Sequence, residues 1–430
     1  MTSAQGEILR VLVSAYACEP DRGSEPGVGW NWVRQIARFN ETWVITRANN
    51  RLSIEAALTK DPIPKAHFIY FDLPAWKYWS PRARETVWWK RRLFLVRPYY
   101  YLWQLGVYFL ARRLHKDLSF DLVHHVTFVN YWLPSFLALL PVPFILGPVG
   151  GGESAPRGFW WSLSIRGKIY ELLRDFGRSL GQLDPFVRLA VRRATVTFAT
   201  TDQTAEKLKH LGCRSVSVLS QVAMTTDEIF QLPESQAGRD SQFRVISVGR
   251  LLNWKGFELG LRSFAILKTR FPASEYWLIG DGPEKKRLKA LAQELCLADS
   301  VRFLHFMPRL QVLETLAACD VLVNPSLHDS GSYVCAEAMA MGLPVICLDV
   351  GGPAVQVTEE TGIKIPATSP KQVIQDMAAA MTQLAYDPSG RERLGQLGRK
   401  RVHDNFMWKQ KGDFIAEIYN RIVPLPQVVR

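Results

Sequence analysis

The chain has 430 residues, of which 47% are hydrophobic, and its formal net charge at pH 7 is +13. This length exceeds what one hydrophobic core usually serves, so two domains are expected, and the hydrophobic share excludes a largely disordered chain. The six cysteines are scattered without a C-x-x-C pair, so their spacing indicates neither a disulfide framework nor a zinc site.

The N-terminal residues 1–20 carry the acidic Glu7 and run directly into a strand-like segment, which is unlike a secretory signal peptide. We therefore expect a cytoplasmic protein. The first half then alternates short β-branched runs with helical stretches, as parallel α/β layers do. The expected elements are a strand at 8–16, a helix at 28–39 and further strands at 42–46, 67–71, 121–126, 143–147 and 194–200.

Two glycine-rich loops follow strands of this half. Gly27 and Gly29 are placed directly before a helix, although the spacing is not the G-x-G-x-x-G of a dinucleotide fingerprint. The second loop has three glycines and an acid in succession: Gly150, Gly151, Gly152 and Glu153. Such loops favour close approach of the backbone to a phosphate or sugar, and a tight turn is the structural alternative.

The segment 76–116 is basic and aromatic. It contains ten Lys or Arg residues against one acid, Glu85, together with twelve aromatic residues. This composition suits an anionic membrane interface, because rings sit at headgroup level and cations meet lipid phosphates. Two alternatives remain: single-stranded nucleic acid, which uses stacking and phosphate contacts, and a helical excursion with core aromatics and solvated charges.

Two further features of the first half concern a possible membrane span and a histidine pair. Residues 126–152 carry no charge, but four prolines interrupt them, so a buried loop–helix–strand sequence is favoured over a transmembrane helix. His124 and His125 end the strand at 121–126. Because side chains alternate along a strand, one ring should face the core and the other a cleft.

The second half repeats the alternation of strands and helices. A polar segment at 231–242, with Pro and Gly, is the expected linker. Beyond it we expect strands within 243–251, 274–283, 301–307, 321–326 and 344–352, with helices at 256–271, 284–297, 310–320 and 333–342. The prediction is therefore an α/β protein with two doubly wound, Rossmann-like domains, whose strands point their carboxyl ends into a cleft between the domains.

Two pairs of charged residues follow strands of this half. Arg250 and Lys255 lie after Gly249 in a loop that leads into a helix, which suits a diphosphate, although solvated surface cations are the alternative. Asp329 and Glu337 follow the strand at 321–326, separated by Gly331 and Ser332 at an expected helix start. Their carboxylates could each grip a vicinal diol, or serve as a helix cap and a solvent-facing acid. Neither a D-x-D pair nor an H-E-x-x-H motif occurs, so no metal is expected.

Taken together, these motifs resemble the retaining nucleotide-sugar transferases of glycosyltransferase family 4 (glycosyl transferases group 1), which have the GT-B fold. The resemblance rests on "VGRLLNWKGF", "LIGDGPE", "VRFLHFMP", "AACDVLVNPSLHDSGSYVCAEAMAMGLPVI", the glycines at 351–352 and "DNFMWKQKGDFIAEIY", in order over residues 244–420. It implies domains at 1–230 and 243–403, joined by 231–242. The helical residues 404–430 would return to the first domain.

The resemblance also implies residue roles. Arg250 and Lys255 would hold the donor diphosphate, and Glu337 would bind the ribose. Asp329 replaces the family's usual first Glu and would address the donor sugar, while the backbone of Phe306 and Met307 would meet the base. His124 matches the first His of the family's "DxVHxH" pattern, but Val126 stands at the second, so His125 is an alternative catalytic residue. The donor-binding set further includes Gly27, Gly29, Gly249, Gly331, Ser332, Tyr333 and Val334, and the acceptor-side loop is Gly150 to Glu153.

The expected function is retaining transfer of a sugar from a nucleotide sugar to a lipid-linked glycan or similar acceptor, without a metal or other cofactor. The protein would act peripherally at the inner face of an anionic membrane, with no nucleic-acid partner. The alternative is a non-catalytic scaffold of the same fold, in which Asp329 marks a decayed site. A basic nucleic-acid binder would explain only residues 76–116.

Overall fold

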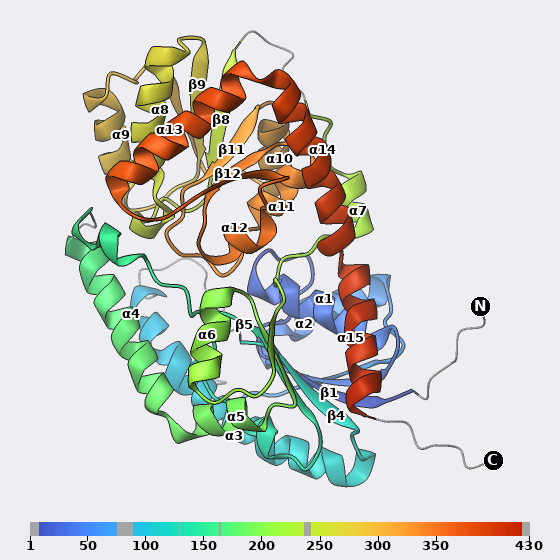
Figure 1. The fold of residues 1–430 in the computed structure, drawn as a ribbon. Coiled ribbons are helices and arrows are strands. Elements are labelled where there is room, and N and C mark those ends of the chain that lie inside the picture. The colour runs from blue at the N-terminus through green and yellow to red at the C-terminus, as the bar shows by residue number, and fades with distance from the viewer. Residues whose placement is uncertain (1–7, 75–88, 129, 163–164, 236–241, 424–430) are drawn as a thin grey trace. The chain divides into compact units, whose positions relative to one another are not determined.

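The computed structural model describes residues 8–74, 89–128, 130–162, 165–235 and 242–423 (Figure 1). The chain divides into two compact units. The first unit comprises residues 1–152, 176–221 and 408–430, and the second comprises 153–175 and 222–407.

The first unit contains a seven-stranded, wholly parallel sheet with the strand order β3-β2-β1-β4-β5-β6-β7. Successive strands run outward from β1 in one direction and then from β4 in the other, which is a doubly wound sheet. Its strands are β1 (Arg10–Ala15), β2 (Glu41–Thr46), β3 (Ala66–Tyr70), β4 (Leu122–Thr127), β5 (Phe144–Val149), β6 (Val196–Ala199) and β7 (Val216–Val218).

Helices cover the first sheet. They are α1 (Glu25–Ala37), α2 (Arg51–Lys60), α3 (Trp89–Leu118), α5 (Pro185–Arg193), α6 (Asp202–His210) and α15 (Trp408–Ile422). The C-terminal helix α15 packs against α1, with the rings of Trp408 and Trp32 in edge contact at 5.4 Å between centroids. The buried Lys411 of α15 donates a hydrogen bond to the Ser220 carbonyl.

The second unit contains a six-stranded parallel sheet with the order β10-β9-β8-β11-β12-β13. Its strands are β8 (Phe243–Val248), β9 (Ser274–Ile279), β10 (Val301–Leu304), β11 (Val321–Asn324), β12 (Val345–Leu348) and β13 (Gly362–Ile365). The helices are α7 (Thr226–Phe230), α8 (Phe257–Arg270), α9 (Lys285–Glu294), α10 (Arg309–Ala317), α11 (Tyr333–Ala340), α12 (Gly351–Gln356), α13 (Pro370–Tyr386) and α14 (Pro388–Asn405). In Figure 1 this sheet lies between α8, α9 and α13 on one face and α10, α11 and α14 on the other.

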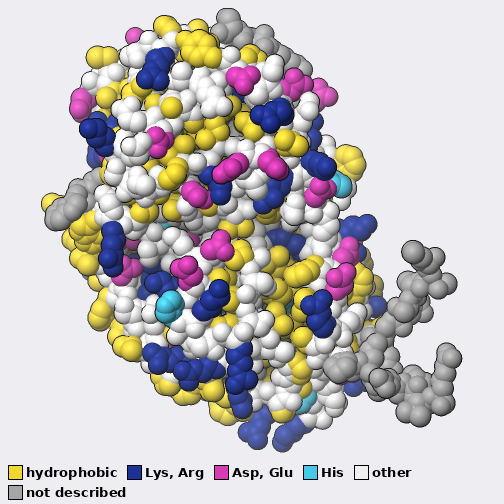
Figure 2. Space-filling view, viewed as in Figure 1, with side chains coloured by type: hydrophobic (Ala, Val, Ile, Leu, Met, Phe, Trp, Pro, Cys, Tyr) yellow, Lys and Arg dark blue, Asp and Glu magenta, His cyan; other side chains and the backbone are white. Residues whose placement is uncertain are grey.

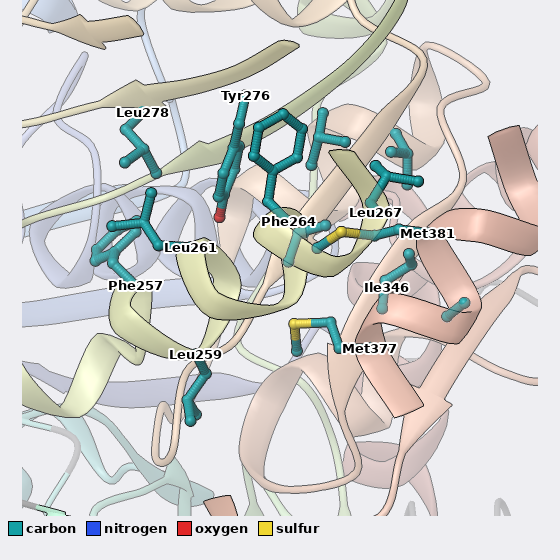
Figure 3. Close-up of a cluster of buried hydrophobic side chains, with 14 of the residues drawn as sticks. Phe257, Leu259, Leu261, Phe264, Leu267, Tyr276, Leu278, Ile346, Met377 and Met381 are labelled. Atoms are coloured by element: carbon teal, nitrogen blue, oxygen red, sulfur yellow. The ribbon is translucent and has the colours of Figure 1, made fainter. Parts of the chain in front are cut away.

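The core of the second unit forms where α8 and α13 pack on the sheet. Figure 3 shows Phe264 of α8 meeting Tyr276 of β9, whose ring centroids are 5.3 Å apart, with Met377 and Met381 of α13 alongside. All of these side chains are buried. Burial of such large apolar groups is the main force that fixes α8, and with it the loop that precedes α8.

The prediction of two doubly wound α/β sheets is confirmed. The observed units nevertheless divide the chain elsewhere than at 230 and 243, because residues 153–175 and 222–230 cluster with the second unit. A long helix, α4 (Ile165–Leu183), begins in the second unit and ends in the first. Residues 236–241 of the expected linker, and 424–430 of the expected C-terminal helix, lie outside the described residues.

Residues 126–152 form the end of β4, a 3₁₀ turn at Phe136–Leu139 and the buried strand β5, as the prolines predicted; residue 129 is outside the described part. Among the described residues, no helix has both the length and the apolar character needed to span a bilayer.

Candidate functional site

The candidate site lies between β8 and β11, where the strand order of the second sheet reverses. Strands β8 and β11 are neighbours there, and helices leave them toward opposite sides. In open α/β sheets, ligands bind outside the carboxyl ends of the strands at this position. The loops that follow β8 and β11 carry Arg250, Lys255 and Asp329, so the sequence-predicted residues come from the two loops that border this point.

The loop after β8 is held close to the loop after β11. It makes a short 3₁₀ turn, Asn253–Lys255, and then reaches Gly256, which has a left-handed φ of 67° and precedes α8. A Cβ at Gly256 would lie 2.0 Å from the Pro325 carbonyl oxygen, so only glycine permits this approach. The Leu327 amide also donates to the Trp254 carbonyl at 2.8 Å.

These contacts bring Lys255 and Asp329 together. The Lys255 ammonium donates to Asp329 Oδ2 at 2.5 Å, and about a fifth of each side chain is exposed. An ammonium has three donors, so this contact leaves Lys255 the capacity to bind a further anion. The sequence placed both residues at the site but did not predict that they pair.

The backbone of Asp329 is seated on the start of α12. The Gly352 amide donates to the Asp329 carbonyl at 2.6 Å, and Gly351 has a φ of 64°. A Cβ at Gly351 would lie 2.4 Å from the same oxygen. The glycine pair therefore allows the start of α12 to contact and support the backbone of Asp329.

Glu337 lies on α11 and is buried in an ionic cluster. Arg309, the first residue of α10, donates to Glu337 Oε1 at 2.9 Å and to Glu228 Oε1 at 2.7 Å. Burial raises the pKa of the Glu337 carboxyl, and the positive charge of Arg309 opposes that rise. Sequence reasoning missed Arg309 and Glu228, because only the fold brings α7, α10 and α11 together.

The remaining predicted donor residues surround these groups. Arg250 is exposed, and no hydrogen bond or ion pair of its side chain occurs among the described residues. Helix α11 begins at Tyr333 with Ser332 as its N-cap, as predicted, but the buried Ser332 hydroxyl accepts from Asn324 at 2.8 Å instead of capping the helix. Phe306 is largely exposed. Gly249 directly follows β8, Gly331 and Val334 flank the helix start, and Met307 is half-buried.

Glu153 belongs to the second unit and contacts the same loop. Its side chain is buried, and its Oε2 accepts a hydrogen bond from the Ser330 hydroxyl at 2.7 Å. The resemblance to the family placed Glu153 in an acceptor-side loop with Gly150, Gly151 and Gly152. In the structure its carboxylate holds Ser330, the residue that follows Asp329.

A second brace on this loop comes from the first half of α4. The ring of Trp254 stacks between Tyr170, with centroids 4.6 Å apart, and His328, with centroids 5.4 Å apart. Glu171 of α4 also contacts His328 Nε2 at 2.8 Å, and both side chains are buried. We call Tyr170, Glu171, Trp254 and His328 the aromatic brace. No local pattern in the sequence indicates it, since its three segments lie more than 70 residues apart along the chain.

In the first unit, His124 has a structural role. Its Nε2 lies 2.7 Å from the Gly147 carbonyl oxygen, which can only accept, and its Nδ1 lies 2.7 Å from the Tyr419 hydroxyl. The ring is therefore neutral with its proton on Nε2, and burial lowers its pKa to about 3. With both nitrogens engaged inside the unit, His124 does not fit the catalytic role expected for it.

The expectation that one of the two histidines faces outward is wrong. His125 is also buried, with Nε2 at 3.4 Å from the Tyr100 hydroxyl, and burial lowers its pKa to about 4. The reason is the position of β4 in the sheet. It is the central strand, and every one of its residues is buried, so both of its faces are covered.

The glycines of the first unit serve packing. Gly27 and Gly29 lie inside α1, not before it, and a Cβ on either would lie within 2.0 Å of a carbonyl oxygen, of Arg22 and Ala17 respectively. Gly152 similarly allows α6 to approach, since its Cβ would lie 2.6 Å from Thr204 Cα. Gly150 and Gly151 lie beside Asn130. These close contacts explain the glycines without a ligand.

Much of the basic and aromatic segment falls in α3. Tyr99, Tyr100 and Trp103 are buried in the core of the first unit, whereas Arg112 and Arg113 are exposed. Residues 76–88 of the segment lie outside the described residues. Among the described residues, no group of three or more His, Cys, Asp or Glu is arranged to hold a metal ion.

Comparison with known proteins identifies relatives of the chain that carries this site. Residues 229–401 match the family model of glycosyl transferases group 1. The lipopolysaccharide core biosynthesis glycosyltransferase of Rhizobium meliloti is 31% identical over 42% of this chain and 50% of its own length. The GDP-mannose-dependent alpha-(1-6)-phosphatidylinositol monomannoside mannosyltransferase of Mycolicibacterium smegmatis is 25% identical over 62% of this chain and 74% of its own. The chain spans about half the length of several relatives that it matches.

Solved structures share the fold over nearly the whole chain. HepE of Anabaena, in complex with UDP, superposes with a TM-score of 0.62 at 17% identity, covering 96% of this chain and 100% of HepE. The described fold is that of the GT-B glycosyltransferases.

Proposed function

We propose that the protein is a retaining glycosyltransferase that uses a nucleotide-sugar donor, because residues 229–401 match the family model of glycosyl transferases group 1. The observation that carries the proposal is the Lys255–Asp329 pair at the switch point between β8 and β11. A cation held beside a helix N-terminus, at the position where such sheets bind ligands, suits a diphosphate.

The nucleoside diphosphate would lie along the two loops. Lys255 and the exposed Arg250 would contact the phosphates, and Glu337, fixed by Arg309, would accept hydrogen bonds from the ribose hydroxyls. The backbone at Phe306 and Met307 would face the base. Gly249 and the α11 start at Gly331 to Val334 would line the phosphates and sugar. HepE binds UDP and the mycobacterial relative uses GDP-mannose, so both nucleotides are candidates.

The reaction would retain the configuration at the anomeric carbon. The bond between that carbon and the diphosphate oxygen breaks, and the acceptor oxygen attacks from the same face. The acceptor proton passes to the departing phosphate oxygen. Lys255 and Arg250 would stabilise the charge that develops on the leaving diphosphate, because preorganised cations lower the energy of such a transition state. The proposal assigns this task to side chains and requires no metal.

Asp329 would orient the donor sugar while it holds Lys255. A carboxylate can accept hydrogen bonds from two sugar hydroxyls, and its 2.5 Å contact with Lys255 fixes its position before the donor arrives. The family's Glu would reach one methylene further than Asp329. We therefore infer that Asp329 is a specificity residue.

The acceptor would be a lipid-linked glycan at the inner face of an anionic membrane. One relative is named for lipopolysaccharide core biosynthesis and another for a phosphatidylinositol monomannoside, which supports an amphiphilic acceptor.

A thermal-shift screen of UDP, GDP and ADP with their sugar forms tests the proposal. A ligand that binds the native state raises the melting temperature. We expect one nucleoside diphosphate to stabilise the protein, and its sugar form to be turned over when a lipid-linked acceptor is supplied. Binding of a nucleotide sugar without turnover under any acceptor would favour the non-catalytic scaffold instead.

A further inference from the structure

Helix α4 exposes a continuous apolar face. Seven large hydrophobic residues lie on it, each between 52% and 77% exposed: Ile165, Ile169, Leu172, Leu173, Phe176, Leu180 and Leu183. Their spacing of three, four and seven residues places them in one stripe along the helix, whatever surrounds it. In Figure 2, hydrophobic side chains gather along the edge that α4 occupies in Figure 1.

The opposite face of α4 is small and polar, and it is this face that packs on the protein. Gly167, Glu171 and Arg178 are buried. Glu171 reaches His328 through the aromatic brace, and a Cβ at Gly181 would lie 2.4 Å from the Trp132 carbonyl oxygen. A surface helix of a globular protein normally buries its apolar stripe and exposes its polar face. The described side chains of helix α4 have the reverse arrangement.

The surroundings of the stripe are basic. Helix α4 contains four Lys or Arg residues and two acids, and Lys168 is half-buried. The neighbouring α3, which α4 meets where Gly177 faces Arg97, also exposes Leu102, Leu105 and Phe109. One to two turns further along α3 come the exposed Arg112, Arg113 and Lys116. Apolar rows that end in exposed cations are the pattern of a helix lying in a membrane interface.

We propose that the apolar face of α4 inserts into the headgroup–acyl boundary of an anionic lipid bilayer. The inference deepens the proposed function and rests on it, because a lipid-linked acceptor is presented at such a surface. A lipid surface fits better than a second copy of the chain, since each copy carries a net charge of +13 and two copies would repel each other. The face belongs to α4, whereas the sequence pattern had pointed to residues 76–116.

Vesicle co-sedimentation tests the proposal. The wild-type protein should bind phosphatidylcholine vesicles that contain phosphatidylglycerol, and bind phosphatidylcholine alone much more weakly. The double variant Leu172→Asp/Phe176→Asp should lose roughly tenfold or more in affinity, because it removes two large apolar groups from the interface. Both side chains are exposed, so the variant should fold.

Matched controls come from exposed apolar residues elsewhere. Leu52 on α2 and Phe230 on α7 are each 82% exposed, so Leu52→Asp/Phe230→Asp makes the same change of charge and apolar surface away from α4. This control should bind vesicles as the wild type does. Equal binding by the α4 variant and the wild type would overturn the proposal.

Two further measurements separate the alternatives. If sedimentation velocity shows a dimer that the α4 variant converts to a monomer, the face is an interface between copies and the membrane proposal is wrong. The α4 variant should still bind the donor nucleotide as the wild type does. If the wild-type protein binds vesicles but binds no nucleotide, the membrane proposal stands and the proposed function is refuted.

Discussion

Lys255 and Asp329 show how two charged residues from separate loops can make one site. Neither residue is informative alone, because surface Lys and loop Asp are common. The sequence placed each of them after a strand, and the parallel sheet brings those two strands together. What the sequence could not provide is the pairing itself, which depends on the fit of Gly256 against Pro325 and of Gly351 against Asp329.

Replacing Asp329 with Glu tests its role in specificity. The longer side chain must either displace Lys255 or move into the space of the donor sugar, so Asp329→Glu should change the donor preference or lower kcat/KM by about tenfold. The measurement is kcat/KM over a panel of sugar nucleotides. An unchanged preference and rate would refute the assignment of Asp329.

Arg309 provides a second prediction at this scale. In Arg309→Gln the buried Glu337 loses the cation that opposes its desolvation, so its pKa should rise further and its carboxylate should be less available to the ribose. Titration calorimetry should show weaker nucleotide binding, by roughly tenfold, that recovers in part as the pH rises and Glu337 ionises. Arg287→Gln on α9, which removes an Arg paired with Glu258 and Glu284, is the control and should bind as the wild type does.

At the scale of elements, the aromatic brace connects α4 to the loop that carries Lys255. Trp254 immediately precedes Lys255 and stacks between Tyr170 and His328. The ring acts as a positioning residue, since it does not itself reach the donor in our proposal. Removal of the ring should therefore loosen the loop that carries Lys255 without removing a charge.

The prediction is that Trp254→Ala raises KM for the donor by about tenfold, and that Trp254→Phe restores most of the loss, because a smaller ring can still stack. Steady-state kinetics with varied donor measure both effects. If Trp254→Phe is as defective as Trp254→Ala, a role in stacking is contradicted.

Elements differ in how well the sequence predicts them. Helix α11 begins where the Gly-Ser signal placed it, because the turn chemistry is local. Helix α1 begins at Glu25, earlier than expected, because Pro26 can occupy a first turn and the glycines that follow it are required by packing on residues 17 and 22. Helix α4 was not among the expected elements. Its apolar residues have amphipathic spacing, but spacing does not say which face is buried, and here the polar face is buried.

For the whole molecule, alternation of strands and helices was enough to predict two doubly wound sheets. The division of the chain into units was not predictable in detail, because it depends on long-range contacts. Residues 153–175 join the second unit through Glu153 and Glu171, and α15 joins the first through Tyr419 and Lys411. No local pattern encodes such returns of the chain.

The buried histidines make the first unit sensitive to acid. The folded-state pKa values are about 3 for His124 and about 4 for His125, below the 6.5 of an unfolded chain. Between pH 4 and 6.5 the unfolded state therefore binds more protons, so stability falls as the pH falls. At pH 5 the loss is roughly 2 kcal/mol for each histidine.

Urea denaturation at pH 7 and pH 5 measures this loss. The variant His125→Leu should show about half the wild-type loss, whereas His210→Leu, at an exposed position of α6, should show the full loss. Equal pH dependence in His125→Leu and the wild type would contradict a neutral, buried His125.

In the proposed reaction, Lys255 stabilises the departing nucleoside diphosphate. Lys268→Ala is the matched control, because Lys268 lies at the far end of α8 and binds only the carbonyls of Pro272 and Ser274 among the described residues. The decisive measurement is kcat for release of nucleoside diphosphate by the wild type and both variants. We predict a loss of about a hundredfold or more in Lys255→Ala and none in Lys268→Ala; wild-type turnover in Lys255→Ala would contradict the account.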